Sequence, residues 1–407
     1  MLYNARQKHG DKMKMTSVLG VLNISVFLKN HVFLLPVLYL FYTACGLSLG
    51  DFFLLQGLSA LTCLLLDVPM GYLTDQVSKK KMMIFSGLLL VLRFALLLLW
   101  PTKIIVFIGE FLYALVIVSY VGTADSYIYE LLKSKNKSIK MLKRYGRLYF
   151  WASIGTGISS LSGAYLYGMW GAQIVIALSL LFSMISVCLL FFLPDVKTSE
   201  VFDKPLLGRY TSLFKAIKQS VKKPKFLSLI GYSAFLTAAY QIFMWSMQPL
   251  MKMAHVPVAL FGVVFFANHI SRGFGSYMAH KMVSVMSLNT LGWITWGGFI
   301  ISFGAAILIT MGTDVFETLF LLGIMCVTIF AQVAYLIAVI AKIHDLSDSQ
   351  NRATAASLNS MAGRLATALC LILSKFILDD FSMQTNLVLF MMLFIPSGII
   401  LWRFNKH

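Results

Sequence analysis

About twelve long apolar stretches, joined by short polar links, account for most of this 407-residue chain. A helix needs about 20 apolar residues to cross the roughly 30 Å hydrocarbon core of a bilayer. Because 59% of the residues are hydrophobic and only 12% are charged, lipid rather than water must surround much of the chain.

The sequence therefore predicts an all-α integral membrane protein with about twelve transmembrane helices and no separate soluble domain. The first 15 residues are polar and basic and lack the apolar core of a cleavable signal peptide. The expected spans are residues 26–45, 52–73, 82–100, 104–131, 148–167, 172–193, 226–250, 258–279, 291–311, 315–341, 353–378 and 386–402.

Positive charge is distributed unevenly between the two sides of this arrangement. Of the 34 Lys and Arg residues, 28 fall in the termini and the even-numbered hairpins when Lys29, near the start of the first span, is counted with the N-terminus, whereas the other side carries only Lys103, Lys252 and Lys375. This bias predicts cytoplasmic N- and C-termini and an even number of spans. We interpret the net charge of +18 as topology determinants facing anionic lipid headgroups, and we expect no nucleic-acid partner.

The longest internal link, residues 194–225, carries eight Lys or Arg residues and lies at the middle of the chain. It is the expected cytoplasmic linker between an N-terminal six-helix bundle, residues 1–193, and a C-terminal six-helix bundle, residues 226–407. A weak internal correspondence between residues 145–148 and 362–365 supports a duplication. In transporters built from two repeats, the substrate site lies near the bilayer midplane between them.

The hairpin between the second and third spans carries a distinctive pattern. Gly71 is followed after three residues by Asp75 and then by the basic cluster 79–81, and an acidic-x-Pro-x lead-in at 67–70 precedes it. This hairpin resembles the signature of the major facilitator superfamily, with two departures, Gln76 and Ser78. The resemblance implies two pseudo-symmetric six-helix bundles, rocker-switch alternating access and a place in the bacterial inner membrane.

The resemblance also implies a gate at this hairpin. Gly71 lets two helices approach closely, and Asp75 faces the N-terminus of the eleventh helix when the cytoplasmic side is closed. That N-terminus carries about half a positive charge, to which Arg352 adds a full one. Lys79 belongs either to the gate or to the positive-inside charges. The alternative for Asp75 is an ordinary solvated loop acid.

Charges inside the expected spans are functional candidates, because each costs a few kcal/mol to place in a bilayer. Asp67, Asp125 and His269 are the proton-coupling candidates. Asp67 has an equally weighted alternative as the structural partner of a basic residue on a neighbouring helix. Asp125 is expected to pair with Arg147, and His269 to be a hydrogen-bonded packing residue.

The substrate-binding candidates lie mainly in the second half, whose expected spans contain almost no acid. Arg364 is the favoured anchor, with Arg272 beside it, and both suggest an anionic or zwitterionic substrate. The alternative for Arg364 is an ion pair with Asp67 across the halves. The remaining substrate-binding candidates are Gln241, Tyr39 and Trp245. In the first half, Arg93 is the expected partner of Glu110.

The sequence carries no phosphate-binding loop or nucleophile triad, so we expect neither an enzyme nor ATP-driven transport. Its five cysteines lie in apolar spans without a CxxC pair, which predicts packing residues and no metal site or cofactor. The predicted function is proton-coupled secondary transport of a small organic solute, such as a metabolite, siderophore or drug, by a monomer. A lipid flippase on the same fold and a transport-inactive membrane sensor or scaffold are the alternatives.

The predicted topology can be checked by cysteine labelling in a variant that lacks the natural cysteines. Ser212→Cys lies in the predicted cytoplasmic linker, whereas Thr102→Cys lies in a predicted external link. A membrane-impermeant maleimide applied to intact cells should label Thr102→Cys and leave Ser212→Cys unlabelled. Labelling of Ser212→Cys from outside would overturn the topology.

Overall fold

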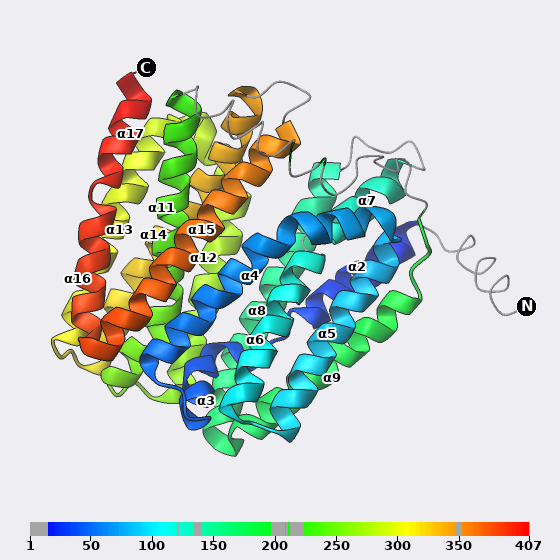
Figure 1. Cartoon of the computed structure of the whole chain (residues 1–407), viewed down its shortest axis with the longest axis horizontal. Helices are drawn as coiled ribbons and strands as arrows, with labels where there is room; N and C mark the ends of the chain where they lie inside the picture. The colour runs from blue at the N-terminus through cyan, green and yellow to red at the C-terminus, as the bar shows by residue number, and fades with distance from the viewer. Residues whose placement is uncertain are drawn as a thin grey trace, which may run out of the picture.

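The computed structural model describes residues 15–120, 122–133, 141–196, 208, 211, 224–346 and 352–406, and all of its regular elements are helices. They group into two bundles that lie side by side, α2–α9 and α11–α17 (Figure 1). The bounds are α2 Met15–Lys29, η1 Leu35–Val37, α3 Leu38–Ala44, α4 Leu49–Gln76, α5 Lys79–Leu99, α6 Lys103–Tyr120, α7 Thr123–Lys133, α8 Met141–Trp170, α9 Ala172–Phe191, α11 Pro224–Met253, α12 Val258–Val285, α13 Leu288–Thr310, α14 Val315–Leu346, α15 Arg352–Asp380, α16 Met383–Phe394 and α17 Ser397–Lys406.

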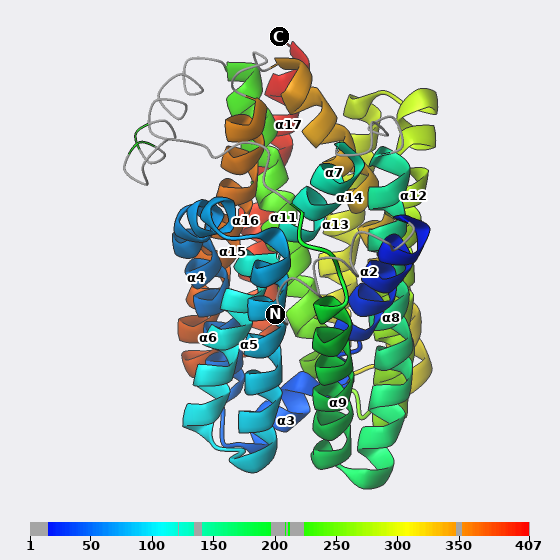
Figure 2. The ribbon, with the colours of Figure 1, turned by 90° about the vertical axis from the view of Figure 1, so that its right-hand side faces the viewer.

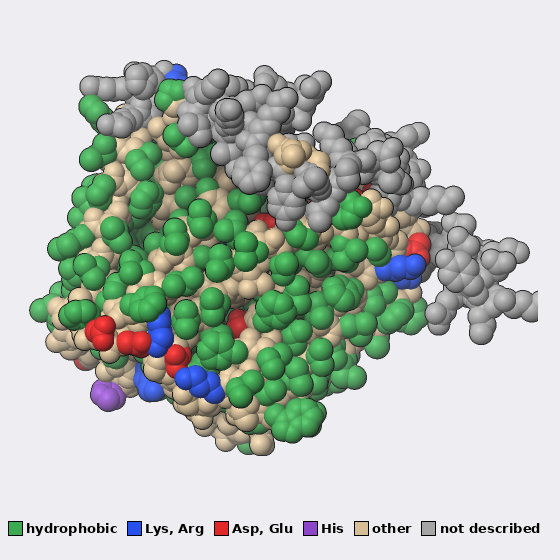
Figure 3. Space-filling model, viewed as in Figure 1, with side chains coloured by type: hydrophobic (Ala, Val, Ile, Leu, Met, Phe, Trp, Pro, Cys, Tyr) green, Lys and Arg blue, Asp and Glu red, His purple; other side chains and the backbone are tan. Residues whose placement is uncertain are grey.

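The described helices have the length and composition of membrane spans. Ten helical stretches are long and apolar enough to cross a bilayer. Of two shorter apolar helices, Leu35–Ala44 lies within the first predicted span, 26–45, whereas Ser17–Lys29 begins nine residues before it. Hydrophobic side chains cover the middle of the face in Figure 3, and many of its charged side chains gather along the lower edge. The predicted all-helical membrane fold is confirmed, and a count of twelve spans is consistent with it.

The first predicted span, 26–45, is interrupted in the structure. Helix α2 ends at Lys29 and α3 begins at Leu38, with one turn of 3-10 helix just before it. Two residues explain the break. The Asn30 side chain donates a 2.8 Å hydrogen bond to the Val26 carbonyl and so competes with the helix for its acceptors, and Pro36 has no N–H to donate.

Two further predicted spans contain breaks for similar reasons. Between α6 and α7 the chain passes through Gly122, whose φ of +80° is a left-handed conformation that favours glycine. Between α16 and α17 lies Pro396, which removes one donor from the helical ladder. Hydropathy averaged over a whole span conceals breaks of this kind, because the few residues at the break count little against the apolar helices on either side.

The two halves meet along two pairs of helices, with α4 packed along α15 and α8 along α12. Figures 1 and 2 show α3 at one end of the bundles and α7 and α17 at the other, and we call these the α3 end and the signature end. Towards the α3 end a Cβ on Gly57 would lie 2.9 Å from the Ile372 nitrogen, and one on Gly262 would lie 2.6 Å from the Ser160 oxygen. Only glycine permits such close packing of backbones.

At the signature end, the glycine of the hairpin pattern is not packed against another backbone. A Cβ on Gly71 would meet nothing within 4 Å. The close helix approach expected at Gly71 is therefore not made in this structure. Ser78, which stands where the signature has glycine, accepts a hydrogen bond from the Lys81 nitrogen at 3.3 Å and so caps α5. The halves are thus tightly packed at the α3 end, whereas Gly71 leaves room at the signature end.

The packing at Gly262 gives a stability test. Gly262→Ala places a methyl group against backbone oxygens of α8, and overpacking of this kind costs about 1–3 kcal/mol. Gly304→Ala in α13 is the matched control, because its Cβ would meet nothing within 4 Å, and alanine favours a helix by up to about 1 kcal/mol. Thermal unfolding of the purified variants should give a lower midpoint for Gly262→Ala only. Equal midpoints would contradict the packing.

Candidate functional site

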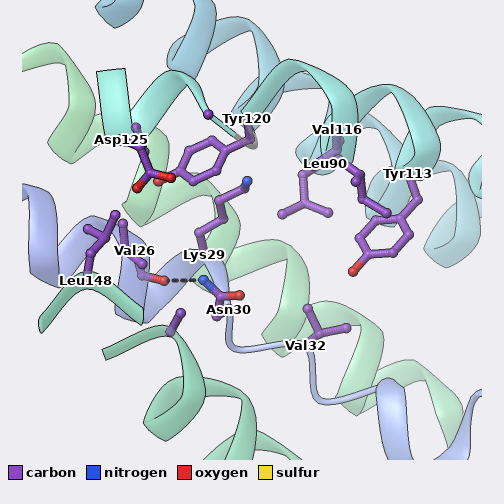
Figure 4. A pocket seen from close by; sticks show the side chains of 14 residues that line it. Val26, Lys29, Asn30, Val32, Leu90, Tyr113, Val116, Tyr120, Asp125 and Leu148 are labelled. Carbon is purple, nitrogen blue, oxygen red and sulfur yellow. Dashed lines mark hydrogen bonds between the residues drawn. The ribbon is translucent and has the colours of Figure 1, made fainter. Parts of the chain in front are cut away.

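A cavity of about 220 Å³ lies inside the N-terminal bundle, enclosed by α2, α5, α6, α7 and α8 (Figure 4). Both helix interruptions of this half border it, through Asn30 and Val32 on one side and Gly122 on the other. Most of its wall is apolar. Its polar and charged side chains come from Lys29, Asn30, Tyr113, Tyr120 and Asp125.

Lys29, the last residue of α2, points into this cavity. Its ammonium lies over the Tyr120 ring, 3.0 Å from the ring centroid (Figure 4). Attraction between a cation and an aromatic face strengthens where water is excluded. The carbonyls that end α2 are already occupied: Asn30 donates to Val26, and His31 donates its backbone N–H to Leu28 at 3.0 Å.

A second cluster is buried directly behind the cavity wall. Arg93 on α5 donates to Glu110 on α6 at 2.7 Å and to the Tyr42 hydroxyl at 3.3 Å, and Tyr42 also donates to Glu110. The guanidinium lies 4.4 Å from the centroid of the cavity-lining Tyr113 ring. The expected Arg93–Glu110 pair is confirmed. The cluster fastens α3 to α5 and α6 and fixes one wall of the cavity.

Arg364 joins the two halves of the protein. Its guanidinium on α15 donates to the Asp67 carboxylate on α4 at 2.6 Å and to the Cys63 carbonyl at 3.1 Å. Asp67 therefore has the basic partner on a neighbouring helix that its structural interpretation requires. Its role in proton coupling stays a prediction. Because Arg364 has a carboxylate partner, its charge no longer indicates an anionic substrate.

The candidates on α11 lie against the first half. Gln248 accepts from the Tyr39 backbone N–H at 2.8 Å and donates to the Leu35 carbonyl at 3.1 Å, so it bonds to the 3-10 turn within the helix break and to the first turn of α3. The Trp245 ring packs edge-on against Phe52 of α4, with ring centroids 5.7 Å apart. Gln241, which lies two turns before Gln248 on α11, is half-buried. Tyr39 and Trp245 thus contribute to contacts between the halves.

The remaining candidates of the second half lie on α12. Arg272 stacks on the Tyr240 ring of α11, with 4.5 Å between the guanidinium carbon and the ring centroid. The Nε2 atom of His269 is buried and makes no hydrogen bond with the described residues. The hydrogen-bonded packing role considered for His269 is therefore not seen at this nitrogen.

At the signature hairpin, Asp75 forms an ion pair of 3.1 Å with Lys79, and Lys79 also donates to the Thr74 carbonyl at 2.8 Å. The side chain of Arg352 lies outside the described residues, as does that of Arg147, the expected partner of Asp125. The expected contact between Asp75 and the start of α15 therefore stays a prediction.

Sequence reasoning missed Lys29 and Tyr113 of the cavity, whereas Tyr120 belongs to a set of aromatic residues that the sequence offers either for lining a cavity or for packing. Lys29 had been grouped with the basic N-terminus, although it falls inside the first predicted span, 26–45. The signal was present: a lysine followed by Asn30 and, six residues later, by Pro36 marks a charged side chain at a helix break inside a membrane.

Two helical bundles with buried ionisable side chains between and within them define a multi-pass helical membrane protein. The chain belongs to the Major Facilitator Superfamily, whose family model matches residues 19–338. No curated protein matches the sequence.

Solved structures support the same fold. The nucleoside transporter NupG is 15% identical, with a TM-score of 0.80 over 96% of this chain and 99% of that one. A bacterial homolog of the human lysosomal transporter Spinster is 14% identical, with a TM-score of 0.68 over 96% and 97% of the two chains. The POT family transporter PepTSo is 12% identical, with a TM-score of 0.72 over 97% and 98%. Identities this low show the fold alone.

The buried Arg93 cluster gives a test that separates pairing from burial. Arg93→Met leaves the Glu110 carboxylate buried without its partner, which typically costs about 3–5 kcal/mol. The double variant Arg93→Met/Glu110→Met removes both charges and should recover most of this loss. Thermal unfolding of the single and double variants measures the coupling. A double variant as unstable as the single one would contradict the pairing.

Proposed function

We propose that this protein is a secondary active transporter that moves a small organic solute by rocker-switch alternating access and couples this movement to protons. The observation that carries the proposal is the asymmetric contact between the halves. Glycines at 57 and 262 bring the halves into backbone contact towards the α3 end, whereas at the signature end a Cβ on Gly71 would meet no described atom within 4 Å. An exchange of tight packing between the two ends is what alternating access requires.

Ion pairs at the α3 end support the same state. Asp51 at the start of α4 pairs with Lys103 at 2.7 Å and with Lys375 of α15 at 3.2 Å, so charge as well as glycine packing holds the halves together there. In this proposal the positive-inside bias places the signature end and both termini in the cytoplasm, in a bacterial inner membrane. The state described is then closed towards the outside, and the protein works as a monomer.

Proton coupling is assigned to Asp67. Its carboxylate bridges the halves through Arg364, and protonation would remove the negative charge that holds this pair together. Each side chain of the pair keeps a fifth to a quarter of its surface exposed, so water can reach the carboxylate. A group whose charge fastens one half to the other can link proton binding to the movement of the halves.

The proposal can be tested without knowing the solute. Purified protein is reconstituted into vesicles that contain a pH-sensitive dye, and a library of small organic solutes is added one by one. A transported solute should change the internal pH only in vesicles with protein. A solute that accumulates with no proton movement and no response to an imposed pH gradient would overturn the coupling.

Asp67→Asn tests the coupling residue itself. The variant should exchange solute across the vesicle membrane yet fail to accumulate it in response to a pH gradient, because residue 67 can no longer bind and release a proton. Asp380→Asn, at the exposed end of α15, is the matched control and should behave like the natural protein. Accumulation by Asp67→Asn against a gradient would leave Asp67 with a structural role only.

A further inference from the structure

The cavity beside Lys29 lies inside one half of the protein, where two interrupted helices meet. We propose that it binds a small organic anion with an aromatic or apolar body, and that Lys29 is the residue that holds the anionic group. The assignment rests on the proposed transport function, because it names the class of solute that this function would move.

The first support is the charge of Lys29. Among the described residues, no acidic oxygen lies within the 4.0 Å of an ion pair with its ammonium, and the ammonium makes no hydrogen bond with them. The carbonyls of the last turn of α2 are already hydrogen-bonded to Asn30 and His31. The Tyr120 ring attracts the ammonium but carries no full charge. A cation placed this way is best compensated by an anion that enters the cavity.

The other intramembrane cations differ from Lys29 in this respect. Arg93 and Arg364 each have a carboxylate partner, Glu110 and Asp67. Arg272 stacks on an aromatic ring, as Lys29 does, but it is not among the residues that line the cavity. Lys29 is thus a cation that has no carboxylate partner among the described residues and that also faces this partly open cavity.

The surroundings of Lys29 set the orientation of a ligand. Asp125 lines the same cavity and is not free of other interactions. In Figure 4 the Tyr120 ring lies between Asp125 and the Lys29 ammonium. A bound anion therefore sits on the Lys29 side of this ring. The Asn30 amide and the Tyr113 hydroxyl, which line the same cavity, add polar contacts to the ligand.

The size and lining of the cavity define the rest of the ligand. A volume of about 220 Å³ lies below the roughly 300–1,000 Å³ of sites for drug-sized molecules. Aliphatic side chains of Val26, Val32, Leu90 and Val116 form much of the wall. This space suits a single ring or a short apolar chain that carries one carboxylate or phosphate.

Binding at equilibrium tests the proposal independently of transport. The full-length protein, purified in detergent, is titrated by calorimetry with benzoate, phenylphosphate, the neutral isostere benzamide and the cation benzylamine. At least one of the two anions should bind about tenfold or more tightly than benzamide, since a charged hydrogen bond is lost with the neutral probe. The stronger of the two anions tells a carboxylate site from a phosphate site.

Variants connect this preference to Lys29. Lys29→Met should abolish the preference for the anion, whereas Lys29→Arg should keep part of it because the charge remains. Lys252→Met is the matched control: Lys252 also lies over a tyrosine ring, that of Tyr39 at 5.2 Å, but it is not among the cavity residues. Its anion preference should equal that of the natural protein.

A second measurement needs no variant. The amine reagent trinitrobenzenesulfonate should modify Lys29, and benzoate at ten times its Kd should slow this reaction about tenfold by mass action. Modification of Lys252, followed by mass spectrometry in the same sample, should be unaffected. Protection of neither lysine, or of both equally, would overturn the proposal.

Equal binding of anions and benzamide, no binding of either anion, or an anion preference that survives in Lys29→Met would each overturn the site. None of these results depends on a proton gradient. Vesicles that transport a solute while the purified protein shows no anion preference would refute the site and leave the proposed transport function intact. Anion binding without transport of any solute would support the site and refute the proposed transport function.

Discussion

Every backbone N–H and C=O inside a bilayer must find a partner within the protein, and this requirement governs the structure. It explains why the described chain is helical throughout. It also explains where the helices can break. At the break in the first span, Ser179 of α9 accepts from the Phe33 nitrogen at 3.0 Å, and Gln248 of α11 bonds to both Leu35 and Tyr39. Side chains from other helices thus replace the bonds that the helix gives up.

These replacements connect the cavity to the contact between the halves. Gln248 belongs to the second half, yet it holds the segment that follows the break, and the same segment carries Tyr42 of the Arg93 cluster. A movement of the second half away from the α3 end would take Gln248 away from the Leu35 carbonyl and the Tyr39 N–H. The geometry near Lys29 is therefore sensitive to the position of the other half, without any direct contact between that half and the cavity.

The sequence predicts the fold well and the site only in part, and the reason is physical. Hydropathy and the distribution of Lys and Arg report how each segment meets lipid and water, so the helical membrane architecture and the signature hairpin could be predicted. Arg93 and Glu110 could be paired because consecutive helices pack together. The Arg364–Asp67 pair joins residues 297 positions apart in the sequence, so only the folded arrangement decides between it and a ligand. Local residues such as Asn30 and Pro36 mark the first helix break, but the partners that satisfy its backbone, Ser179 and Gln248, are distant in the sequence and no local pattern reveals them.

The intramembrane cations illustrate how compensation relates to function. Arg93, buried and bonded to both Glu110 and Tyr42, is suited to a permanent structural role, because its charge is satisfied within one half. Arg364 is satisfied by the opposite half, so in the proposed alternating access its compensation would change as the halves move. Lys29 has an aromatic face and a partly open cavity beside it, and in our proposal its compensation comes from a ligand. One fold thus holds three kinds of charge compensation. The pair within one half suits stability, the pair between the halves suits their proposed movement, and the cation beside a cavity suits the proposed binding of a ligand.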